Sequence, residues 1–472
     1  MSEPVALPLW LTIAGALLAA WAFYEHVLMP ALRWMVMHPA NQVIDEVGKR
    51  LRIGIRPFQR TRRQALIHRL VTDPKVQQTA EQYARQNNVP LLTVMQIVER
   101  YARETVPAFN AYLYFRIGYW VGKRVAQMLY RVRLGYVDAE NLQRVEPDAT
   151  VVFVMNHRSN MDYVLAGYLA ADQTALSYAV GEWARIWPLS ALIRWMGAYF
   201  VRRNSKDELY RRVLERYIVM ATEAGVPQAV FPEGGLTRDG RLREPKLGAI
   251  DYMMRGFRLD GERDLVFVPL GINYDRVLED RTLLRALDPD ATRRGKLAAL
   301  WTTLKFAARN LWLAMRSEWH RFGYACVNFG APVSMRAYCR ERNVDFHQLS
   351  SDARRQAIAL LGNHLMDSVG RIVPVLPVPL IASVFMRQGD RAISELELKA
   401  KVEQLVEQLQ ARGAHVYVPR KDFDYAINVG LRMLRLRRLV GERDGLFYAQ
   451  SEETAILRYY ANSIAHLLEQ RG

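Results

Sequence analysis

The sequence predicts an α/β fold in which helices flank a mixed, largely parallel sheet, with helical regions before and after it. Between about residues 148 and 332, short apolar runs alternate with stretches of helical periodicity, an order typical of parallel sheets. On either side of this part, apolar residues recur at helical spacing without such runs. With 472 residues, the chain is long enough for two or three domains.

Residues 5–24 contain no charged side chain and predict one N-terminal membrane-anchoring helix. A helix of about 20 residues spans roughly 30 Å, the thickness of the hydrocarbon core of a bilayer. A cleaved signal peptide is the alternative, but the basic segment that should precede it is missing. Basic residues accumulate between positions 33 and 63, so the positive-inside rule places the rest of the chain in the cytoplasm. We assign residues 1–37 to the membrane anchor.

Residues 38–140 are predicted to form a helical region. Leu66 and Leu70 share one face of a first helix, and the pair Asp73-Pro74 interrupts that pattern. The segment 112–133 is rich in aromatic residues, with arginines and lysines between them. It fits a packed helix with a solvated basic face, and contact with lipid headgroups is the other interpretation.

Six apolar runs predict the strands of the α/β domain, which we place at residues 141–335. They are residues 151–155, 176–180, 198–201, 228–231, 265–270 and 324–329. The most distinct helix between them is predicted at residues 207–224. Residues 336–472 return to helical periodicity, notably at 394–412 and 453–470, and form the predicted C-terminal helical region.

The charge balance is strongly basic, with 65 lysines and arginines against 48 aspartates and glutamates. The net charge of +17 is compatible with nucleic acid, anionic lipid or polyanionic small molecules as partners. We expect no nucleic acid, because no recognisable reader motif is present and the anchor places the chain at a membrane. The two cysteines, Cys326 and Cys339, form no C-x-x-C pair, so neither a disulfide framework nor a cysteine zinc site is predicted.

Directly after the first predicted strand, His157 and Asp162 offer the groups that acyl transfer to an alcohol requires. Imidazole can take a proton from a hydroxyl near neutral pH, and a carboxylate can orient the ring and stabilise the imidazolium. Five positions apart on a regular helix, the two side chains would diverge. The pair therefore needs His157 in a strand-to-helix turn and Asp162 in the first helical turn, which the turn and cap residues Asn156, Ser159 and Asn160 permit. A capped helix with an incidental histidine is the alternative.

Three further polar segments follow later predicted strands, where ligands bind in parallel sheets. Residues 197–203 end in Arg202 and Arg203, whose guanidinium groups can grip a phosphate or simply begin a solvated loop. Residues 231–248 contain a glycine pair that lets backbone approach a ligand, followed by basic residues; a hairpin turn is the alternative. Residues 266–274 contain a proline that could shape an acyl pocket or merely end a strand.

Taken in order, these segments resemble the motifs of the glycerolipid acyltransferase superfamily, which is defined by an H-x-x-x-x-D motif and three further blocks. They are most similar to the bacterial membrane-bound glycerol-3-phosphate 1-acyltransferase family. The matching segments, in chain order, are residues 157–163, 197–203, 233–246, 268–274, 327–332 and 459–466.

The resemblance implies that His157 is the general base and Asp162 its orienting partner. The residues implied to bind phosphate or to shape the acceptor site belong to the second and third blocks. They are Arg202, Arg203, Glu233, Gly234, Arg238 and Lys246. Neither a metal nor another cofactor is expected.

The implied reaction moves a fatty acyl group from acyl-CoA or acyl carrier protein to the sn-1 hydroxyl of glycerol 3-phosphate. The product is lysophosphatidic acid, and the step is the first of phospholipid synthesis. The enzyme is expected in the inner (plasma) membrane, with its catalytic domain on the cytoplasmic face beside an anionic membrane surface.

Two alternatives stay open. Leu236 stands where the family usually has an arginine, and residues 231–234 are similar to the sister family that acylates lysophosphatidic acid to phosphatidic acid. The second alternative is a non-catalytic membrane lipid-binding protein on the same fold, against which the intact pair of His157 and Asp162 argues.

Overall fold

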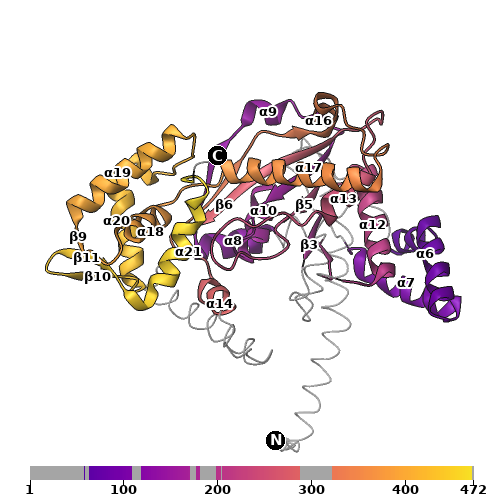
Figure 1. Ribbon diagram of the computed structural model, residues 1–472, viewed down its shortest axis with the longest axis horizontal. Coiled ribbons are helices and arrows are strands. Elements are labelled where there is room, and N and C mark those ends of the chain that lie inside the picture. The colour runs from indigo at the N-terminus through magenta and orange to yellow at the C-terminus, as the bar shows by residue number, and fades with distance from the viewer. Residues whose placement is uncertain are drawn as a thin grey trace, which may run out of the picture.

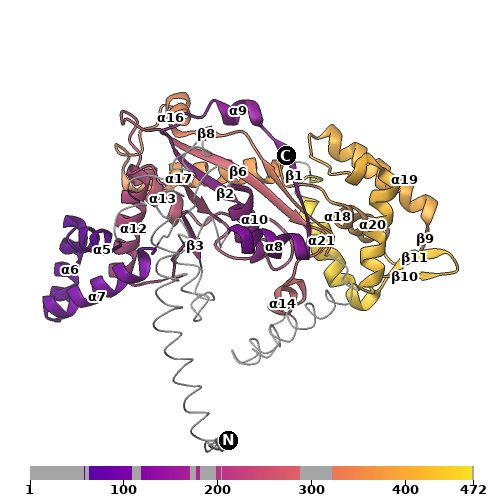
Figure 2. The ribbon, with the colours of Figure 1, turned by 180° about the vertical axis from the view of Figure 1, so that it is seen from behind.

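The structure is a computed structural model, and the residues that it describes are 58, 63–108, 119–170, 177–180, 198–202, 205–287 and 322–469. A central sheet lies between two outer groups of helices, one formed by N-terminal residues and one by C-terminal residues (Figure 1). The same order is seen from behind (Figure 2). In the part of the chain that is described, no helix has both the length and the apolar character needed to cross a bilayer. The predicted anchor at residues 1–37 lies outside that part.

Three helices form the N-terminal group: α5 (Arg63–Val71), α6 (Pro74–Gln86) and α7 (Leu91–Thr105). The Asp73 carboxylate caps α6 by accepting hydrogen bonds from the backbone N–H groups of Lys75 and Val76, and Pro74 occupies the first turn. The break that the sequence predicts at Asp73-Pro74 is therefore a helix start. Apolar faces of all three helices join one buried cluster with the central domain.

Eight strands of the described chain form the central sheet in the order β1-β7-β6-β2-β5-β3-β4, with β8 paired to β6. They are β1 (Arg131–Val137), β2 (Thr150–Met155), β3 (Ser177–Val180), β4 (Ala198–Phe200), β5 (Gln228–Val230), β6 (Leu265–Tyr274), β7 (Tyr324–Phe329) and β8 (Val333–Ser334). Both β7 and β8 run antiparallel to β6, and every other pairing is parallel. The predicted mixed, largely parallel sheet is confirmed.

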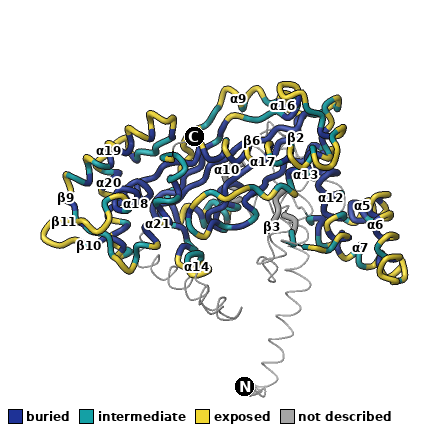
Figure 3. The backbone as a smooth tube through the Cα atoms, viewed as in Figure 1, coloured by how far each residue is buried: buried dark blue, intermediate teal, exposed yellow. Residues whose placement is uncertain are grey.

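Alternate residues of the central strands face two separate cores, as the two-residue period of a strand requires. Val151 and Phe153 pack into one apolar cluster, and Val152 and Val154 pack into the other. Because all six residues of β2 are buried, its continuous apolar sequence is that of a strand covered on both faces. In Figure 3 the same central strands are dark blue, and exposed backbone is confined to the periphery.

Helices from different parts of the chain cover these two faces. They are α8 (Tyr119–Leu129), α9 (Ala139–Gln143), α10 (Met161–Ala170), α12 (Glu208–Glu223), α13 (Gly248–Arg255), α14 (Asp280–Arg285) and α16 (Met335–Arg342). Buried residues of α8 and α10 belong to the first cluster, whereas α12 and α13 belong to the second. The helix predicted at residues 207–224 is confirmed as α12, with Asp207 as its N-cap.

The C-terminal region is mainly helical. Its helices are α17 (Ser351–Arg371), α18 (Pro377–Gln388), α19 (Glu395–Ala411), α20 (Phe423–Leu436) and α21 (Thr454–Ala465), with short 3-10 turns at Pro419–Lys421 and Ser451–Glu453. It also contains a small antiparallel sheet of β9 (Ile393–Ser394), β10 (Val440–Arg443) and β11 (Leu446–Ala449), which the helical prediction for this region did not include. Figures 1 and 2 show α17 along the central sheet and α21, in yellow, between that sheet and α19 and α20.

One central strand also lies in a segment for which the sequence predicts helix. β1 occupies residues within the predicted helical region 38–140 and pairs in parallel with β7. Most of its residues are exposed, so its sequence lacks the apolar run that marks the buried strands. Its partner lies about 190 residues further along the chain, and this pairing decides the conformation of the segment.

Candidate active site

The first polar motif forms a tight turn between β2 and α10. His157 lies two residues after the end of β2, and Asp162 is the second residue of α10. The imidazole Nδ1 and the carboxylate Oδ2 are 2.9 Å apart, and both side chains are almost completely buried. The geometric condition set by the sequence, with the histidine in the turn and the aspartate in the first helical turn, is therefore met.

The Asp162 carboxylate fixes the ring in one tautomer. Its Oδ2 also accepts hydrogen bonds from the backbone N–H groups of Arg158, at 2.7 Å, and Ser159, at 3.0 Å. Because an ionised carboxylate only accepts, the imidazole Nδ1 must be the nitrogen that carries the proton. The other nitrogen, Nε2, is buried and has no hydrogen-bond partner among the described residues. Nε2 is thus free to accept a proton from a bound hydroxyl.

Tyr274, the last residue of β6, completes the coordination of Asp162. Its hydroxyl donates a 2.5 Å hydrogen bond to Oδ1, the oxygen that does not contact His157. Burial, reinforced by the neighbouring Asp162 carboxylate, raises the pKa of Tyr274, which keeps the phenol protonated as a donor. The sequence offers no signal for this contact, because it joins residues 112 positions apart.

We expect Tyr274→Phe to lower the turnover number by about tenfold, since a hydrogen bond to a charged group contributes about 1.5–3 kcal/mol. Without the phenol, Oδ1 is buried with one partner fewer, and the carboxylate can rotate away from the ring. Tyr130→Phe is the matched control, because that buried ring packs 5.2 Å from Tyr274 and its hydroxyl binds the Arg276 carbonyl instead. Steady-state turnover assays of both variants check the prediction, and equal losses would contradict it.

Neighbouring side chains hold the turn itself. The Asn156 amide donates to the Ile272 carbonyl at 2.8 Å and accepts from the Ile272 N–H at 2.8 Å, so it extends the pairing of β2 with β6 by one step. The Glu279 carboxylate accepts hydrogen bonds from the Ser159 hydroxyl and from the backbone and side-chain N–H groups of Asn160. The turn and cap residues of the motif therefore fix its backbone.

Glu233 joins the third polar segment to the first. Its Oε1 accepts the backbone N–H of His157 at 2.8 Å, and its Oε2 accepts that of Arg243 at 3.2 Å. The side chain is 1% exposed, and this burial raises its pKa to about 7, against the lowering effect of the His157 N–H. Glu233 therefore holds the backbone of His157 in place and does not line the cavity described below.

The raised pKa of Glu233 predicts a pH-dependent part of the folding stability. The ordinary pKa is 4.5, so the protonated form stabilises the folded state below that pH, and this contribution disappears as pH rises towards 7. A shift of this size corresponds to about 3 kcal/mol. Between pH 4.5 and 7.5, the melting temperature of the parent protein should fall relative to that of Glu233→Gln as pH rises, because only the parent loses this contribution. Parallel curves for the two proteins would refute this prediction.

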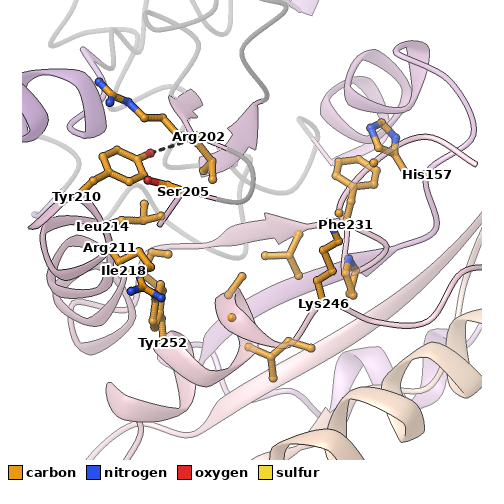
Figure 4. Close-up of a pocket in the computed structure, with 18 of the residues that line it drawn as sticks. His157, Arg202, Ser205, Tyr210, Arg211, Leu214, Ile218, Phe231, Lys246 and Tyr252 are labelled. Atoms are coloured by element: carbon orange, nitrogen blue, oxygen red, sulfur yellow. Dashed lines mark hydrogen bonds between the residues drawn. The ribbon is translucent and has the colours of Figure 1, made fainter. Parts of the chain in front are cut away.

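A cavity of about 290 Å³ opens beside the imidazole. Figure 4 shows His157, Phe231 and Lys246 on one side, and Arg202, Tyr210, Arg211 and Tyr252 on the opposite side. Most of the other lining residues are apolar: Val201, Leu214, Ile218, Val230, Ala249 and Ile250. An apolar cavity with basic residues on its walls suits a molecule that has both an alkyl chain and an anionic group.

The structure brings some of the predicted binding residues to this cavity. Arg202, Gly234 and Lys246 line it, whereas Arg238 is exposed elsewhere and Arg203 lies outside the described residues. Gly234 has a φ of +67°, and a Cβ atom there would lie 2.5 Å from the Lys246 side chain. A glycine is therefore required for the lysine to cross this loop.

Arg202 is already engaged within the protein. Its guanidinium forms a two-pronged ion pair with the Glu104 carboxylate of α7, at 3.0 and 2.8 Å, and lies over the Tyr101 and Tyr210 rings. An anion at this arginine must share it with Glu104. Arg211, one turn into α12, also lines the cavity, and nothing in its sequence surroundings distinguishes it from a solvated helix residue.

Among the described residues, no group of three or more histidine, cysteine, aspartate or glutamate side chains is placed to hold a metal ion. What the turn and cavity can do chemically is acid–base work by one oriented imidazole next to a space for an amphiphilic substrate.

Two protein-family models match the chain. One, described as Acyltransferase, matches residues 136–273, which contain the His157–Asp162 turn and the cavity. The other, described as Glycerol-3-phosphate acyltransferase C-terminal region, matches residues 310–471 and so includes α17 to α21.

The chain is similar to curated proteins named glycerol-3-phosphate acyltransferase. It is 26% identical over 448 residues to that of Haemophilus ducreyi (strain 35000HP / ATCC 700724), covering 91% of this chain and 52% of that protein. The corresponding protein of Pseudomonas putida (strain W619) is 24% identical over 464 residues, covering 94% and 52%. The chain thus spans about half the length of these relatives.

Among solved structures, the chain is similar to the crystal structure of the 1-acyl-sn-glycerophosphate (LPA) acyltransferase, PlsC, from Thermotoga maritima. The sequence identity is 16%, the TM-score is 0.31, and the match covers 54% of this chain and 78% of that one.

Proposed function

Because the chain belongs to the glycerol-3-phosphate acyltransferase family, we propose that it transfers a fatty acyl group from an acyl thioester to the sn-1 hydroxyl of glycerol 3-phosphate. The observation that carries the proposal is the buried imidazole, whose Nδ1 is held by Asp162 and whose Nε2 has no partner among the described residues. The product is lysophosphatidic acid.

In the proposed reaction, His157 Nε2 takes the proton of the sn-1 hydroxyl while that oxygen attacks the thioester carbonyl carbon. The Asp162 carboxylate stabilises the imidazolium that forms. The tetrahedral oxyanion then collapses, the carbon–sulfur bond breaks, and the leaving thiolate takes the proton from the imidazolium. The base is regenerated, and the two products are the ester and a free thiol of coenzyme A or acyl carrier protein.

The cavity supports an acceptor that carries phosphate. Lys246 and Arg202 lie on its walls, and we propose that they bind the phosphate, with Arg203, Arg238 and the newly found Arg211 as further candidates. Gly234 shapes the loop under Lys246, and Glu233 holds the backbone of the base. The apolar remainder of the wall fits the acyl chain of the donor.

We further propose that residues 1–37 anchor the enzyme in the inner membrane, with the catalytic domain on the cytoplasmic face. The uncharged run at residues 5–24 and the basic residues after it support this location. The net charge of +17 suits an anionic membrane surface, as well as a dianionic acceptor and a polyanionic donor.

The deciding experiment uses the full chain with radiolabelled glycerol 3-phosphate, and with acyl-CoA and acyl carrier protein as alternative donors. The expected result is labelled lysophosphatidic acid, with the acyl group at sn-1 by positional analysis. Thiol release that depends on the acceptor distinguishes an enzyme from a lipid-binding protein. No release with either donor would overturn the proposal.

A second acceptor is favoured by one observation, the Leu236 that replaces the usual arginine after the glycine pair. The second acceptor is 1-acylglycerol 3-phosphate, with phosphatidic acid as product, and residues 231–234 are similar to the sister family that uses it. Competition between the two acceptors on the same preparation separates the two functions, because the preferred acceptor suppresses acylation of the other.

A further inference from the structure

Arg158 directly follows His157 in the turn, and its side chain points away from the cavity into the protein. It is 1% exposed and does not line the cavity. Its guanidinium donates to three backbone carbonyls: Nε to Ile272 at 3.2 Å, Nη1 to Gly240 at 2.7 Å and Nη2 to Ser463 at 2.8 Å. No carboxylate of the described residues forms an ion pair with it. Burying a guanidinium charge without a carboxylate partner costs desolvation free energy, so stability alone does not account for an arginine at this position.

The three carbonyls belong to three different parts of the chain. Ile272 lies on β6, Gly240 lies in the loop after β5, and Ser463 lies on α21 of the C-terminal region. The fork of a guanidinium can reach all three at fixed angles, whereas a lysine ammonium cannot. Arg158 therefore ties the backbone beside His157 to the last described helix.

Other contacts press the same loop against α21. Gly240 has a φ of +86°, and a Cβ atom there would lie 2.0 Å from the Tyr459 carbonyl oxygen. The Asn462 amide donates to the Asp239 carbonyl at 2.9 Å. The loop in turn contacts the base, because the Thr237 N–H donates to the His157 carbonyl at 3.0 Å. A continuous chain of hydrogen bonds thus joins α21 to His157.

We propose that Arg158 is a positioning residue through which α21 of the C-terminal region sets the geometry of the His157–Asp162 pair. The kinetic test of this role rests on the proposed acyl transfer, whereas the spectroscopic test below does not. On this view the C-terminal region is part of the catalytic architecture and not a separate neighbour of it. Arg158 itself touches neither substrate nor a reacting atom.

The kinetic test compares Arg158→Lys with Arg437→Lys, a second buried arginine that also contacts α21. Arg437 binds the Tyr460 hydroxyl at 2.8 Å and the Asp280 carboxylate at 2.5 Å, and neither partner belongs to the His157 turn. Both variants are assayed at a temperature at which circular dichroism shows them folded. Arg158→Lys should lower kcat by about tenfold or more with KM of both substrates within about twofold, and Arg437→Lys should keep kcat within about threefold. Equal losses of kcat would overturn the proposal.

A double variant tests whether α21 transmits the effect. Asn462→Ala removes the neighbouring contact between α21 and the loop. If both side chains act through the same junction, kcat of Arg158→Lys/Asn462→Ala falls less than the product of the two single reductions. If the reduction of kcat in the double variant equals the product of the two single reductions, the two side chains act independently, and α21 does not act through Arg158.

A spectroscopic readout tests the geometry without catalysis. The Nδ1 proton that His157 shares with Asp162 should give a downfield proton NMR signal, identified by its loss in His157→Gln. The signal should persist in Arg437→Lys and shift or broaden in Arg158→Lys, whereas an unchanged signal in Arg158→Lys would overturn the inference. If the parent protein acylates neither acceptor, the proposed function fails, and this signal alone decides on Arg158.

Discussion

His157→Ala is expected to reduce the rate of acyl transfer by about 10,000-fold. The His157 side chain lines the cavity, and its Nε2 has no hydrogen-bond partner among the described residues. General-base assistance is typically worth about 100- to 10,000-fold in rate. We expect the upper end of that range, because the deletion also leaves the Asp162 carboxylate buried without its imidazole partner. The measurement is thiol release from acyl-CoA in the presence of glycerol 3-phosphate.

Folding must be shown to survive this change. The ring packs against Phe231 and Tyr163, with centroid distances of 4.2 and 5.3 Å, so its removal leaves a cavity and lowers the melting temperature. His415→Ala serves as control, since that half-buried ring stacks on Tyr136 at 3.9 Å and is not a lining residue of the cavity. Activity that persists in folded His157→Ala would remove the histidine from the role of base.

Asp162→Asn is expected to lower turnover on the order of 1,000- to 10,000-fold while the protein remains folded. The amide has nearly the shape of the carboxylate, so its oxygen can still accept the backbone N–H groups of Arg158 and Ser159. It carries no charge, however, and cannot stabilise the imidazolium. The loss should appear in kcat, with KM for both substrates nearly unchanged.

A second buried aspartate provides the matched control. Asp275 is 1% exposed and accepts the backbone N–H groups of Tyr324 and Val378, with no contact to the imidazole. Asp275→Asn should lower the melting temperature without a comparable loss of kcat. If the two variants lose kcat equally, Asp162 acts through stability and not through the charge that it places beside His157.

The sequence predicts the parts of this protein that depend on local patterns. The buried strand β2 has an uninterrupted apolar sequence, and the turn after it is built from residues that favour turns and caps. Those two features together were enough to place His157 and Asp162 at the end of a strand. The carboxyl ends of the parallel strands β2 and β5 lie at the same edge of the sheet. Glu233, which follows β5, therefore lies next to His157.

Contacts between distant positions were beyond such patterns. The exposed strand β1 exists because it pairs with β7, and the basic, aromatic sequence of that segment suits a helix equally well. The ion pair of Arg202 with Glu104 joins residues 98 positions apart, so the sequence could present the arginine only as a free cation. Arg211 lies in the predicted helix 207–224, whereas Tyr274 lies beyond residue 270, where the predicted strand ended, because β6 continues to Tyr274. The orientation of both side chains towards the site follows from tertiary packing.

The bond from Arg158 to the Ser463 carbonyl has a consequence for biosynthesis. The two residues are 305 positions apart, so the ribosome makes the catalytic turn long before its last acceptor. At a translation rate of about 5–20 residues per second, the delay is roughly 15–60 s. During that interval the nascent chain contains His157 and Asp162 but lacks the hydrogen bond from Arg158 to the Ser463 carbonyl. On the proposed role of Arg158, full acyl-transfer activity therefore requires residue 463 to be synthesised and α21 to be docked.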